Sequence, residues 1–539
     1  MRRLAVGSLR LLMLAANTAR AQPTAEDQHV HPAGDPSQLG RVHFPVSCTP
    51  PAQEKFDLAV AILHSFWYEE SEKAFAEVVD ADPRCVMGYW GIAMSLYHPL
   101  WEPPREVPRV QAFLEKARAI GGRTDREREF LGAIDVIYRD ADTVPLLTRA
   151  RAWEKAHEQI HLRYPKDHEA AIFYGLALLA TAAPTDKTYA NQIKAGALLE
   201  EILPEEPGHP GLAHYIIHAY DFPELALHGF AAAHAYARIA PAVPHAQHMP
   251  SHIFVRVGLW DETIAANQRA FQSGYDYAQA QHTGVAPEQL HALDYMVYAY
   301  LQQGRDRDAR RIIAQALELQ TTLTNDAMVA DYNRVAMEAR LPLERGDWAE
   351  AARLPVRGAP LTIGAALAHF ARAIGAARTA DTAQAHAEIT ALASIEADIT
   401  RRGDNDWARV VGIKRQIATA WAELAVGDTT AALRDAKAAA DLEDVTEKQP
   451  VTPGELLPAR ELEGDMLLAA GRYAAAQIAY ETALAREPNR ARSLYGSARA
   501  AELAGDRAGA RRRYDEFLGQ LKSGDGDRAE IARARTALR

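Results

Sequence analysis

The chain has 539 residues, enough for three or four ordinary domains, and carries a net charge of −11. This acidic balance argues against a nucleic-acid-binding protein, which needs a basic surface. Apolar residues make up 48% and charged residues 24% of the chain, as in globular proteins that bury a core. The chain contains 20 His but only 2 Cys, which excludes a disulfide-rich scaffold and a cysteine-rich zinc module. Any metal chemistry therefore depends on His and carboxylate side chains.

Residues 1–21 have the pattern of a secretory signal peptide. A charged start at Arg2 and Arg3 precedes a short apolar run over 11–16 and a small-x-small cleavage site at 19–21. We therefore expect a periplasmic or secreted protein, and a cytoplasmic protein with a mildly apolar start is the alternative. Cleavage would remove four Arg and no acid, which changes the net charge to −15. No later stretch reaches 18 uninterrupted apolar residues, so no membrane span is expected.

Export would allow a disulfide between Cys48 and Cys85, and two buried thiols are the alternative. Residues 22–52 are rich in Pro, Gly and His, so we expect a loosely ordered segment before the first helix. Its histidines are expected to be solvated, and they are His29, His31 and His43.

Beyond residue 52 the sequence predicts an almost entirely helical chain. Ala-rich stretches with 3.6-residue apolar spacing alternate with short Gly, Asp or Pro breaks, and the Val/Ile/Thr runs typical of strands are absent. A period of 34 residues separates three equivalent pairs near the C-terminus: Gly471 and Gly505, Ala476 and Ala510, and Tyr480 and Tyr514. This period and these residues resemble the tetratricopeptide repeat, a unit of helix A, turn and helix B. The resemblance implies an all-α solenoid of stacked repeats.

The same frame continues upstream with less regular spacing. Predicted unit ends and helix A to helix B turns fall at Pro83, Pro165, Pro207, Pro241, Gly258, Gly304, Gly346 and Gly427. The irregular spacing predicts an inserted loop at 273–288, and Pro and Gly residues mark candidate linkers at 355–360 and 450–454. We therefore expect five parts in chain order: a signal peptide at 1–21, a loosely ordered segment at 22–52, a His-rich solenoid at 53–354, divergent helical repeats at 355–449 and a C-terminal repeat pair at 450–539.

Eight His and Asp side chains keep a fixed position within this frame. They fall at positions 2, 5, 9 and 12 of successive units, a stripe offset by about 100° from the packing stripe of helix A. In tetratricopeptide proteins this stripe lines the concave groove in which ligands bind. The eight residues are His214, His218, Asp221, His245, His248, His252, His291 and Asp294.

This stripe predicts a metal site. His214 and His218, like His248 and His252, are four residues apart and share a helix face. Imidazoles from helices packed about 8–10 Å apart can converge on one ion. Neutral imidazole suits zinc, copper and iron, and the two Asp would add charge and orient the rings. Six His and two Asp exceed one tetrahedral site, so two metals, or one metal with an outer shell, are both open.

The other histidines carry weaker signals. His64 and His98 are also 34 residues apart but lie at the edge of the predicted groove, so ligation and a structural role are both open for them. Other histidines lie in predicted B helices or in segments where the repeat pattern is weak, and we expect them to be structural or solvated. They are His157, His161, His228, His234, His369 and His386.

Pro250 interrupts the frame at one of these pairs. Within a helix, proline removes a hydrogen bond and disfavours helical geometry at the residue before it, here Met249. We therefore expect the helix to begin near Pro250, as proline tolerates a first turn. His245 and His248 would then lie on a preceding loop, whereas His252 is helical in either case.

No motif assigns a reaction. The stretch from His214 to His218 lacks the Glu that helical zinc proteases place after the first His, and no phosphate-binding loop, Gly-x-Ser-x-Gly elbow or Cys-x-x-Cys-His haem motif is present. Four tyrosines flank the His positions and are expected to pack between helices: Tyr215, Tyr220, Tyr295 and Tyr298.

Several stretches contain residues that the tetratricopeptide motif itself does not specify. They are Val42-His43-Phe44 through Ser47-Cys48, Leu63-His64-Ser65-Phe66, Tyr89-Trp90-Gly91, His214 to Asp221, and His245-x-x-His248-x-Pro250-Ser251-His252. Over residues 40–305 they resemble a family of exported bacterial tetratricopeptide-repeat proteins with a His-rich central region. The resemblance implies export and fold but no reaction.

Three functional hypotheses remain. The leading one is an exported solenoid with a His/Asp metal site in its concave groove, acting as a metal binder or as a metalloenzyme. The alternative is a metal-free scaffold whose groove binds a peptide or protein. The third is a cofactor-free hydrolase with Ser251 beside His252 as the nucleophile.

Overall fold

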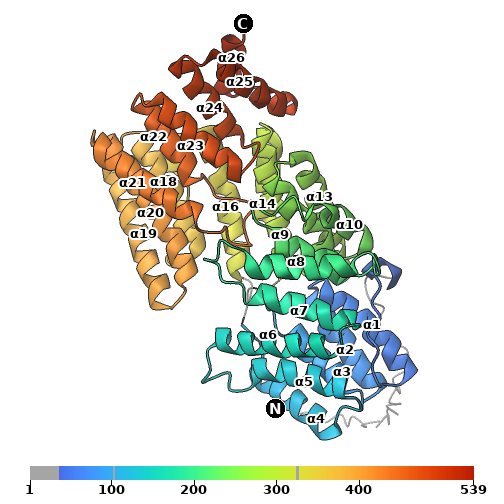
Figure 1. Ribbon diagram of the computed structural model, residues 1–539. Helices are drawn as coiled ribbons and strands as arrows, with labels where there is room; N and C mark the ends of the chain where they lie inside the picture. Colours follow the sequence, from blue (N-terminus) through green and yellow to red (C-terminus); the bar gives the residue numbers. More distant parts are fainter. Residues whose placement is uncertain (1–35, 101–102, 323–326) are drawn as a thin grey trace, which may run out of the picture.

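The computed structural model describes residues 36–100, 103–322 and 327–539 (Figure 1). The predicted signal peptide, His29 and His31 lie outside these ranges. Within them the chain is helical, and its extended pairing is a single isolated bridge between Val285 and Thr321. The prediction of an all-α solenoid of stacked helix pairs is therefore confirmed. Among the described residues no helix is both long and apolar enough to cross a bilayer.

The described residues of the N-terminal part form one short 3-10 helix, Pro36–Leu39, and eight α-helices. The α-helices are α1 (Pro50–His64), α2 (Tyr68–Ala81), α3 (Val86–Ser95), α4 (Val107–Ile120), α5 (Asp125–Tyr138), α6 (Leu146–Arg163), α7 (His168–Ala180) and α8 (Ala190–Ile202). They share one apolar core with the helices that follow, as far as Phe254.

The central part carries the predicted site residues. Its helices are α9 (Pro210–Tyr220), α10 (Phe230–Ile239), α11 (Pro244–His248), α12 (Pro250–Arg256), α13 (Trp260–Ala280), α14 (Pro287–Gln302), α15 (Asp306–Glu318) and α16 (Ala327–Arg345). Helix α13 continues to Ala280, so much of the stretch predicted as an inserted loop at 273–288 is helical. The loop that remains is short.

The C-terminal part completes the solenoid. Its helices are α17 (Trp348–Ala352), α18 (Ile363–Arg378), α19 (Thr382–Arg401), α20 (Asn405–Ala425), α21 (Thr429–Asp444), α22 (Ala459–Ala469), α23 (Tyr473–Arg486), α24 (Ala491–Ala504), α25 (Arg507–Gln520) and α26 (Ala529–Ala537). In Figure 1 the chain runs from the N-terminal helices at one end of the molecule to α26 at the other, and α18–α21 project to one side.

Alternate helices form two layers. Helices α14, α16, α18, α20, α22 and α24 contact one another in sequence and form the inner layer. Helices such as α19, α21 and α23 each pack against the inner helices before and after them. Small residues allow this close packing: a Cβ on Gly496 would lie 2.4 Å from the ring of Tyr480, and one on Gly464 would lie 2.9 Å from it. The repeat pattern at the C-terminus therefore reflects helix-to-helix packing.

The predicted turns between helices A and B have the expected geometry. At Gly258, φ is +68°, and an added Cβ would lie 2.4 Å from the carbonyl oxygen of Pro488. Left-handed backbone and this close approach both favour glycine. The turns predicted further along the chain also have positive φ, at Gly304, Gly346, Gly427, Gly471 and Gly505.

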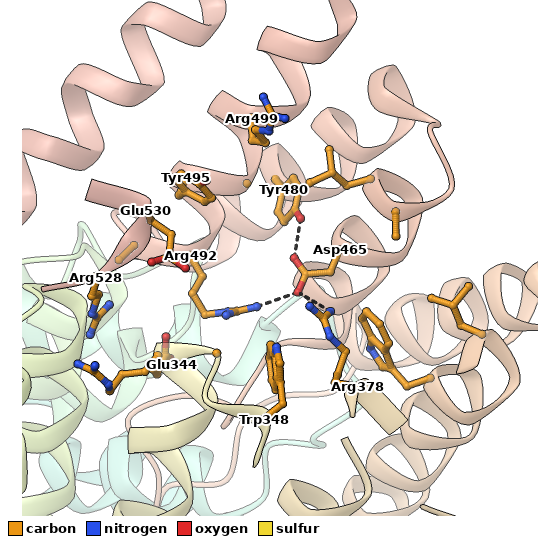
Figure 2. Close-up of a pocket in the computed structure, with 18 of the residues that line it drawn as sticks. Glu344, Trp348, Arg378, Asp465, Tyr480, Arg492, Tyr495, Arg499, Arg528 and Glu530 are labelled. Atoms are coloured by element: carbon orange, nitrogen blue, oxygen red, sulfur yellow. Dashed lines mark hydrogen bonds and ion pairs between the residues drawn. The ribbon is translucent and has the colours of Figure 1, made fainter. Parts of the chain in front are cut away.

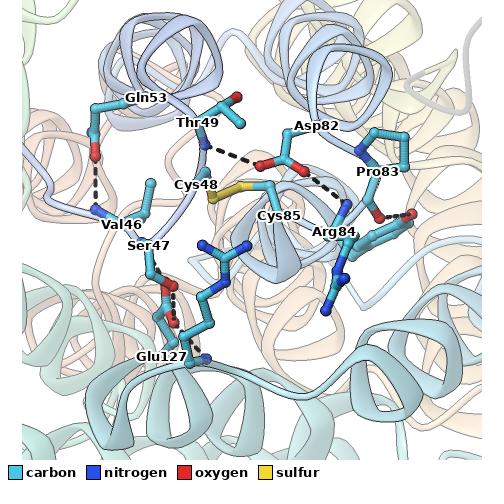
Figure 3. Close-up of a disulfide and its surroundings, with 12 residues drawn as sticks. Val46, Ser47, Cys48, Thr49, Gln53, Asp82, Pro83, Arg84, Cys85 and Glu127 are labelled. Carbon is cyan, nitrogen blue, oxygen red and sulfur yellow. Dashed lines mark hydrogen bonds between the residues drawn. A yellow bond between two sulfur atoms is a disulfide. The ribbon is translucent and has the colours of Figure 1, made fainter.

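A disulfide joins Cys48 to Cys85 and fastens the segment before α1 to the start of α3 (Figure 3). Ser47 donates its N–H to Glu127 at 2.7 Å, and Phe44 is fully buried in the N-terminal core. The expectation of a loosely ordered segment is therefore wrong for residues 39–49, because bulky apolar groups and carboxylate partners hold it in place. His43 is solvated, as expected, with 78% of its side chain exposed.

Residues 445–458, which we call the crossing segment, connect α21 to α22 and lie against α14 and α16. Thr452 is 2% exposed, and its carbonyl oxygen accepts a hydrogen bond from Tyr295 at 3.3 Å. Arg340 donates to the carbonyl oxygen of Gly454 at 2.9 Å. The linker predicted at 450–454 is thus a buried part of the fold, since its backbone oxygens satisfy buried donors.

Candidate metal centre

Three predicted ligands, His214, His218 and His245, form the first triad. His214 and His218 lie on α9, and His245 lies on α11. The Nε2 atom of His214 is 3.0 Å from Nε2 of His218 and 3.1 Å from Nε2 of His245. Three imidazole nitrogens from two helices therefore point at one small volume.

His248, His252 and His291 form the second triad. His248 ends α11, His252 lies on α12 and His291 lies on α14. The Nε2 atoms of His248 and His252 are 3.0 Å apart. One ring nitrogen from each of the three lies within 4.8 Å of the others. All six predicted histidines thus gather in two neighbouring groups.

Helical geometry at Met249 makes this arrangement possible. Met249 has φ −51° and ψ −37°, so α11 and α12 follow each other with a single residue between them. The expectation that His245 and His248 lie on a loop is therefore wrong. The proline lacks an N–H, but it stands at the start of α12, and the N–H of His252 bonds to the carbonyl oxygen of Met249 at 3.1 Å.

Hydrogen-bond acceptors behind the triads orient four of the six rings through Nδ1. His214 Nδ1 donates to the carbonyl oxygen of His64 at 2.6 Å, and His291 Nδ1 donates to that of Val451 at 2.9 Å. His252 Nδ1 lies 2.8 Å from a carboxylate oxygen of Asp221. An Nδ1–H fixed in this way leaves the lone pair on Nε2, the atom that faces the triad.

Asn267 on α13 orients the fourth ring. Its Oδ1 accepts from His248 Nδ1 at 2.6 Å, and its Nδ2 donates to the carbonyl oxygen of Thr263 at 2.8 Å. The second bond fixes which end of the amide faces His248. The sequence carries no signal for Asn267, which is one of several polar residues in α13.

The contact between His248 and His252 has a chemical consequence. Both rings carry their proton on Nδ1, so both Nε2 atoms are acceptors, and two acceptors 3.0 Å apart cannot hydrogen-bond to each other. Nitrogens bound to one ion at about 2.0–2.1 Å in tetrahedral geometry are about 3.3 Å apart. The spacing is within a few tenths of an ångström of that value, so a cation between the nitrogens satisfies both lone pairs.

Burial keeps these imidazoles neutral. It lowers the pKa of His248 to about 3, with His252 adding to the effect. Burial and the neighbouring histidines likewise lower the pKa values of His214, His218, His245 and His291. Burial also lowers the pKa of His252, although Asp221 opposes the shift. Neutral imidazole is the form that binds metal, so these rings are held in a ligating state at neutral pH.

The two triads are largely covered, in contrast to the open concave groove that was expected. His214 is fully buried, His248 and His252 are 5% and 4% exposed, and the other three rings are partly exposed. The crossing segment covers His291 through Val451. On the other side, the ring centroid of Phe66 lies 4.4 Å from that of His214. The stacking of the repeats brings α1 into contact with α9. This contact joins distant repeats, so the pattern within a single repeat does not predict it.

Phe66 also has an unusual backbone. Its φ is +54°, a conformation that is rare for a bulky residue and costs on the order of 1 kcal/mol or more. Such strain persists where surrounding contacts enforce it, and it is common at functional sites. Here it places the aromatic ring against the first triad.

The two predicted Asp residues have different surroundings. Asp221 binds His252 and also accepts from Arg256 Nε at 2.8 Å and Lys448 Nζ at 3.3 Å. Burial opposes its ionisation, but Lys448 and Arg256 outweigh burial and hold the pKa of Asp221 well below its usual range. Asp221 is therefore an ionised acceptor that holds the ring of His252 through Nδ1.

The structure does not bring Asp294 to the triads. Its carboxylate is fully buried and engages Arg340 through two hydrogen bonds of 2.8 and 3.1 Å. Although Asp294 is three residues from His291, its side chain lies against α16. The stripe could not reveal this partner, because Arg340 comes from a unit whose position depends on the curvature of the solenoid.

His64 joins a separate buried cluster. His64 Nε2 and His209 Nε2 both lie 2.9 Å from Glu169, and His64 Nδ1 lies 2.9 Å from the hydroxyl of Tyr215. His209 Nδ1 also accepts the N–H of Gly211 at the start of α9. These groups satisfy one another, so the cluster ties α9 to α1 and α7. His98 instead stacks on Tyr68, with ring centroids 3.8 Å apart.

Ser251 is not placed for nucleophilic attack. Its hydroxyl is fully buried and donates to the carbonyl oxygen of His248 at 2.7 Å, within its own helix turn. Tyr215, Tyr295 and Tyr298 are fully buried between helices, and Tyr220 is 4% exposed. The hydrolase hypothesis thus lacks a nucleophile at Ser251.

A cavity of about 660 Å³ lies between the inner helices of the C-terminal part (Figure 2). The guanidinium of Arg378 lies 4.5 Å from the ring centre of Trp348 and 4.3 Å from that of Trp421. Asp465 accepts from Arg492 at 2.7 Å, whereas its distance to Arg378 is 3.8 Å. Cationic groups and aromatic planes thus face this hollow, about which the sequence made no specific prediction.

Comparisons with known proteins add little to this description. No family model matches the chain, and no curated protein matches it in sequence. Among solved structures, yeast Tom70 is 11% identical with a TM-score of 0.29, and the alignment covers 90% of this chain and 88% of that one. A human IFIT1 dimer with m7Gppp-AAAA is 12% identical with a TM-score of 0.34, covering 81% and 90%. The Cut9–Hcn1 hetero-tetramer of APC/C is 11% identical with a TM-score of 0.30, covering 91% and 90%.

Proposed function

We propose that this protein is an exported helical-repeat protein that holds two transition-metal ions, one at each histidine triad. The observation that carries the proposal is the pair of Nε2 atoms on His248 and His252, two acceptors 3.0 Å apart in a buried site. The similar convergence in the first triad supports a second ion. Zinc, copper and iron are the metals that all-imidazole ligation suits, and the bound protein acts as a metal binder or a metalloenzyme.

Export rests on separate observations. The signal-peptide pattern at 1–21 and the disulfide between Cys48 and Cys85 both suit an oxidising compartment. A periplasmic or secreted location follows, and cell fractionation with N-terminal sequencing of the mature chain tests it. Recovery of an uncleaved chain in the cytoplasm would contradict export.

Elemental analysis tests the metal centre directly. The protein, purified without chelator, is expected to carry two ions per chain, and a chelator is expected to lower its melting temperature, because metal bound to the folded state adds stability. The double variant His214→Ala with His252→Ala removes one ligand from each triad and is expected to lose both effects.

His386→Ala is the matched control, because His386 is exposed on α19 and bonds only within its own helix turn, to the carbonyl oxygen of Thr382. The control is expected to bind two ions. A wild-type protein that stays metal-free after incubation with zinc and with copper would overturn the proposal.

Peptide binding at the C-terminal cavity is a second candidate function. The guanidinium of Arg378, placed between two indole rings, suits an acidic side chain on an extended peptide. Indole fluorescence on titration with an acidic peptide, with chelator present throughout, tests this candidate. Equal signals from wild type and Arg378→Gln would exclude it.

A further inference from the structure

Building on the proposed function, we infer that the two triads hold a pair of copper ions that binds one molecule of dioxygen between them. The inference rests on three features of the described residues: the closeness of the triads, the absence of charge in their ligand set, and the cover that Phe66 and the crossing segment form over part of the site. Each feature restricts the chemistry that the centre supports.

The triads are close enough for their ions to share one ligand. The ring centroids of His245 and His248, from different triads, are 6.3 Å apart, and those of His218 and His252 are 6.4 Å apart. Centroids within the first triad are 4.8 to 6.5 Å apart. The six rings therefore form one continuous cluster, and two-metal sites with ions about 3.5–4 Å apart bridge small ligands.

Charge balance selects the metal. The six ligands are neutral imidazoles, and the ionised groups beside them, Asp221, Arg256 and Lys448, add no net negative charge. Two divalent ions would place four positive charges in this buried site without an anionic ligand, which is costly. Two monovalent ions halve that charge. Among the metals that imidazole suits, copper is the one with a stable monovalent state.

The same charge balance favours dioxygen as the ligand that the two ions share. Each copper(I) gives up one electron and becomes copper(II), and dioxygen accepts both electrons and becomes the peroxide dianion. The oxygen–oxygen double bond becomes a single bond, and each ion gains a bond to oxygen. No proton is required, and the total charge of the site stays at two positive charges. A small neutral molecule also suits a centre whose walls are Phe66 and the crossing segment.

Stoichiometric oxygen uptake tests the inference. The chain is stripped of metal, loaded with copper(I) under argon and exposed to dioxygen in an oxygen electrode. We expect one dioxygen to be consumed for every two copper ions. We also expect the oxidised protein to give no copper(II) resonance by electron paramagnetic resonance, because a shared ligand couples the two spins.

Three comparison samples define the baseline. Zinc-loaded wild type cannot give up an electron and is expected to consume no oxygen. His291→Ala weakens the second triad alone and is expected to keep one copper and to lose the two-to-one uptake. His386→Ala is expected to match wild type.

The outcomes separate the inference from the function on which it rests. Two bound coppers that give two resolved copper(II) signals, or that fail to take up oxygen, overturn the copper–dioxygen inference and leave the two metal sites in place. Fewer than two ions bound with both zinc and copper overturns the metal sites themselves, and with them the inference.

Discussion

Asn267 provides a sharp test of the second triad, because it is a fully buried side chain that contacts His248 but cannot bind the ion itself. In Asn267→Ala, His248 loses the acceptor that fixes its proton on Nδ1 and its ring orientation. Removing such an outer-shell partner typically weakens metal binding about 10- to 100-fold, which corresponds to about 1.4–2.7 kcal/mol. We expect one of the two binding steps to weaken by this amount while the other is unchanged.

Asn333→Ala is the matched control. Asn333 is also fully buried, and its Nδ2 donates to the carbonyl oxygen four residues earlier, that of Val329, as Asn267 does to Thr263. Its Oδ1 has no hydrogen-bond partner among the described residues. The two variants therefore lose the same volume and the same helix bond, and they differ in the contact to His248.

The assay is a copper(I) titration of the metal-free protein under argon against a chromogenic chelator, with the melting temperature of each metal-free variant measured in parallel. Similar melting temperatures for the two variants, together with weaker binding for Asn267→Ala alone, support the orienting role. If both variants bind two ions with wild-type affinity, the hydrogen bond does not prepare His248 as a ligand, and the reasoning from fixed tautomers is wrong.

Three other predictions follow from buried contacts. Asp294→Ala is expected to keep two bound ions but to lose about 3–5 kcal/mol of stability, since it leaves Arg340 buried and unpaired; loss of an ion would contradict the placement of Asp294. Replacing Cys48 and Cys85 with Ala is expected to cost about 4 kcal/mol in urea unfolding, from the entropy of the closed loop, and to abolish sensitivity to reductant. Burial lowers the pKa of His157 to about 3, so the unfolded chain binds a proton that the folded one does not, and stability falls as pH drops below about 6.5. In urea titrations, we expect the free energy of unfolding of His157→Leu to rise relative to that of wild type by about 1.4 kcal/mol for each pH unit between pH 6 and 4. A difference between the two proteins that does not change with pH would refute this.

Much of the fold could be predicted because it depends on local pattern. Apolar spacing and glycine turns such as Gly258 reflect the geometry of single helices and of the turn between two of them. The same logic identified all six triad histidines, since spacings of four and of 34 residues keep a side chain on one face of successive units. A helix begins at Pro250, as expected, but the proline gave the wrong placement of His245 and His248. It stands at the first position of α12, where its missing N–H breaks no bond within the helix, and a separate short helix, α11, forms before it.

The sequence by itself therefore determined the helical repeat and the set of candidate ligands, because both follow from periodicity along the chain. Only the tertiary structure divided the six histidines into two triads and placed Asp294 away from them. It also placed Asn267 and Val451 against ring nitrogens of the triads and Lys448 against Asp221. Val451 is 160 residues from His291, the ring that it orients. The curvature of a solenoid accumulates over many repeats, so contacts of this range depend on the summed geometry of all the helices between them and not on any local pattern.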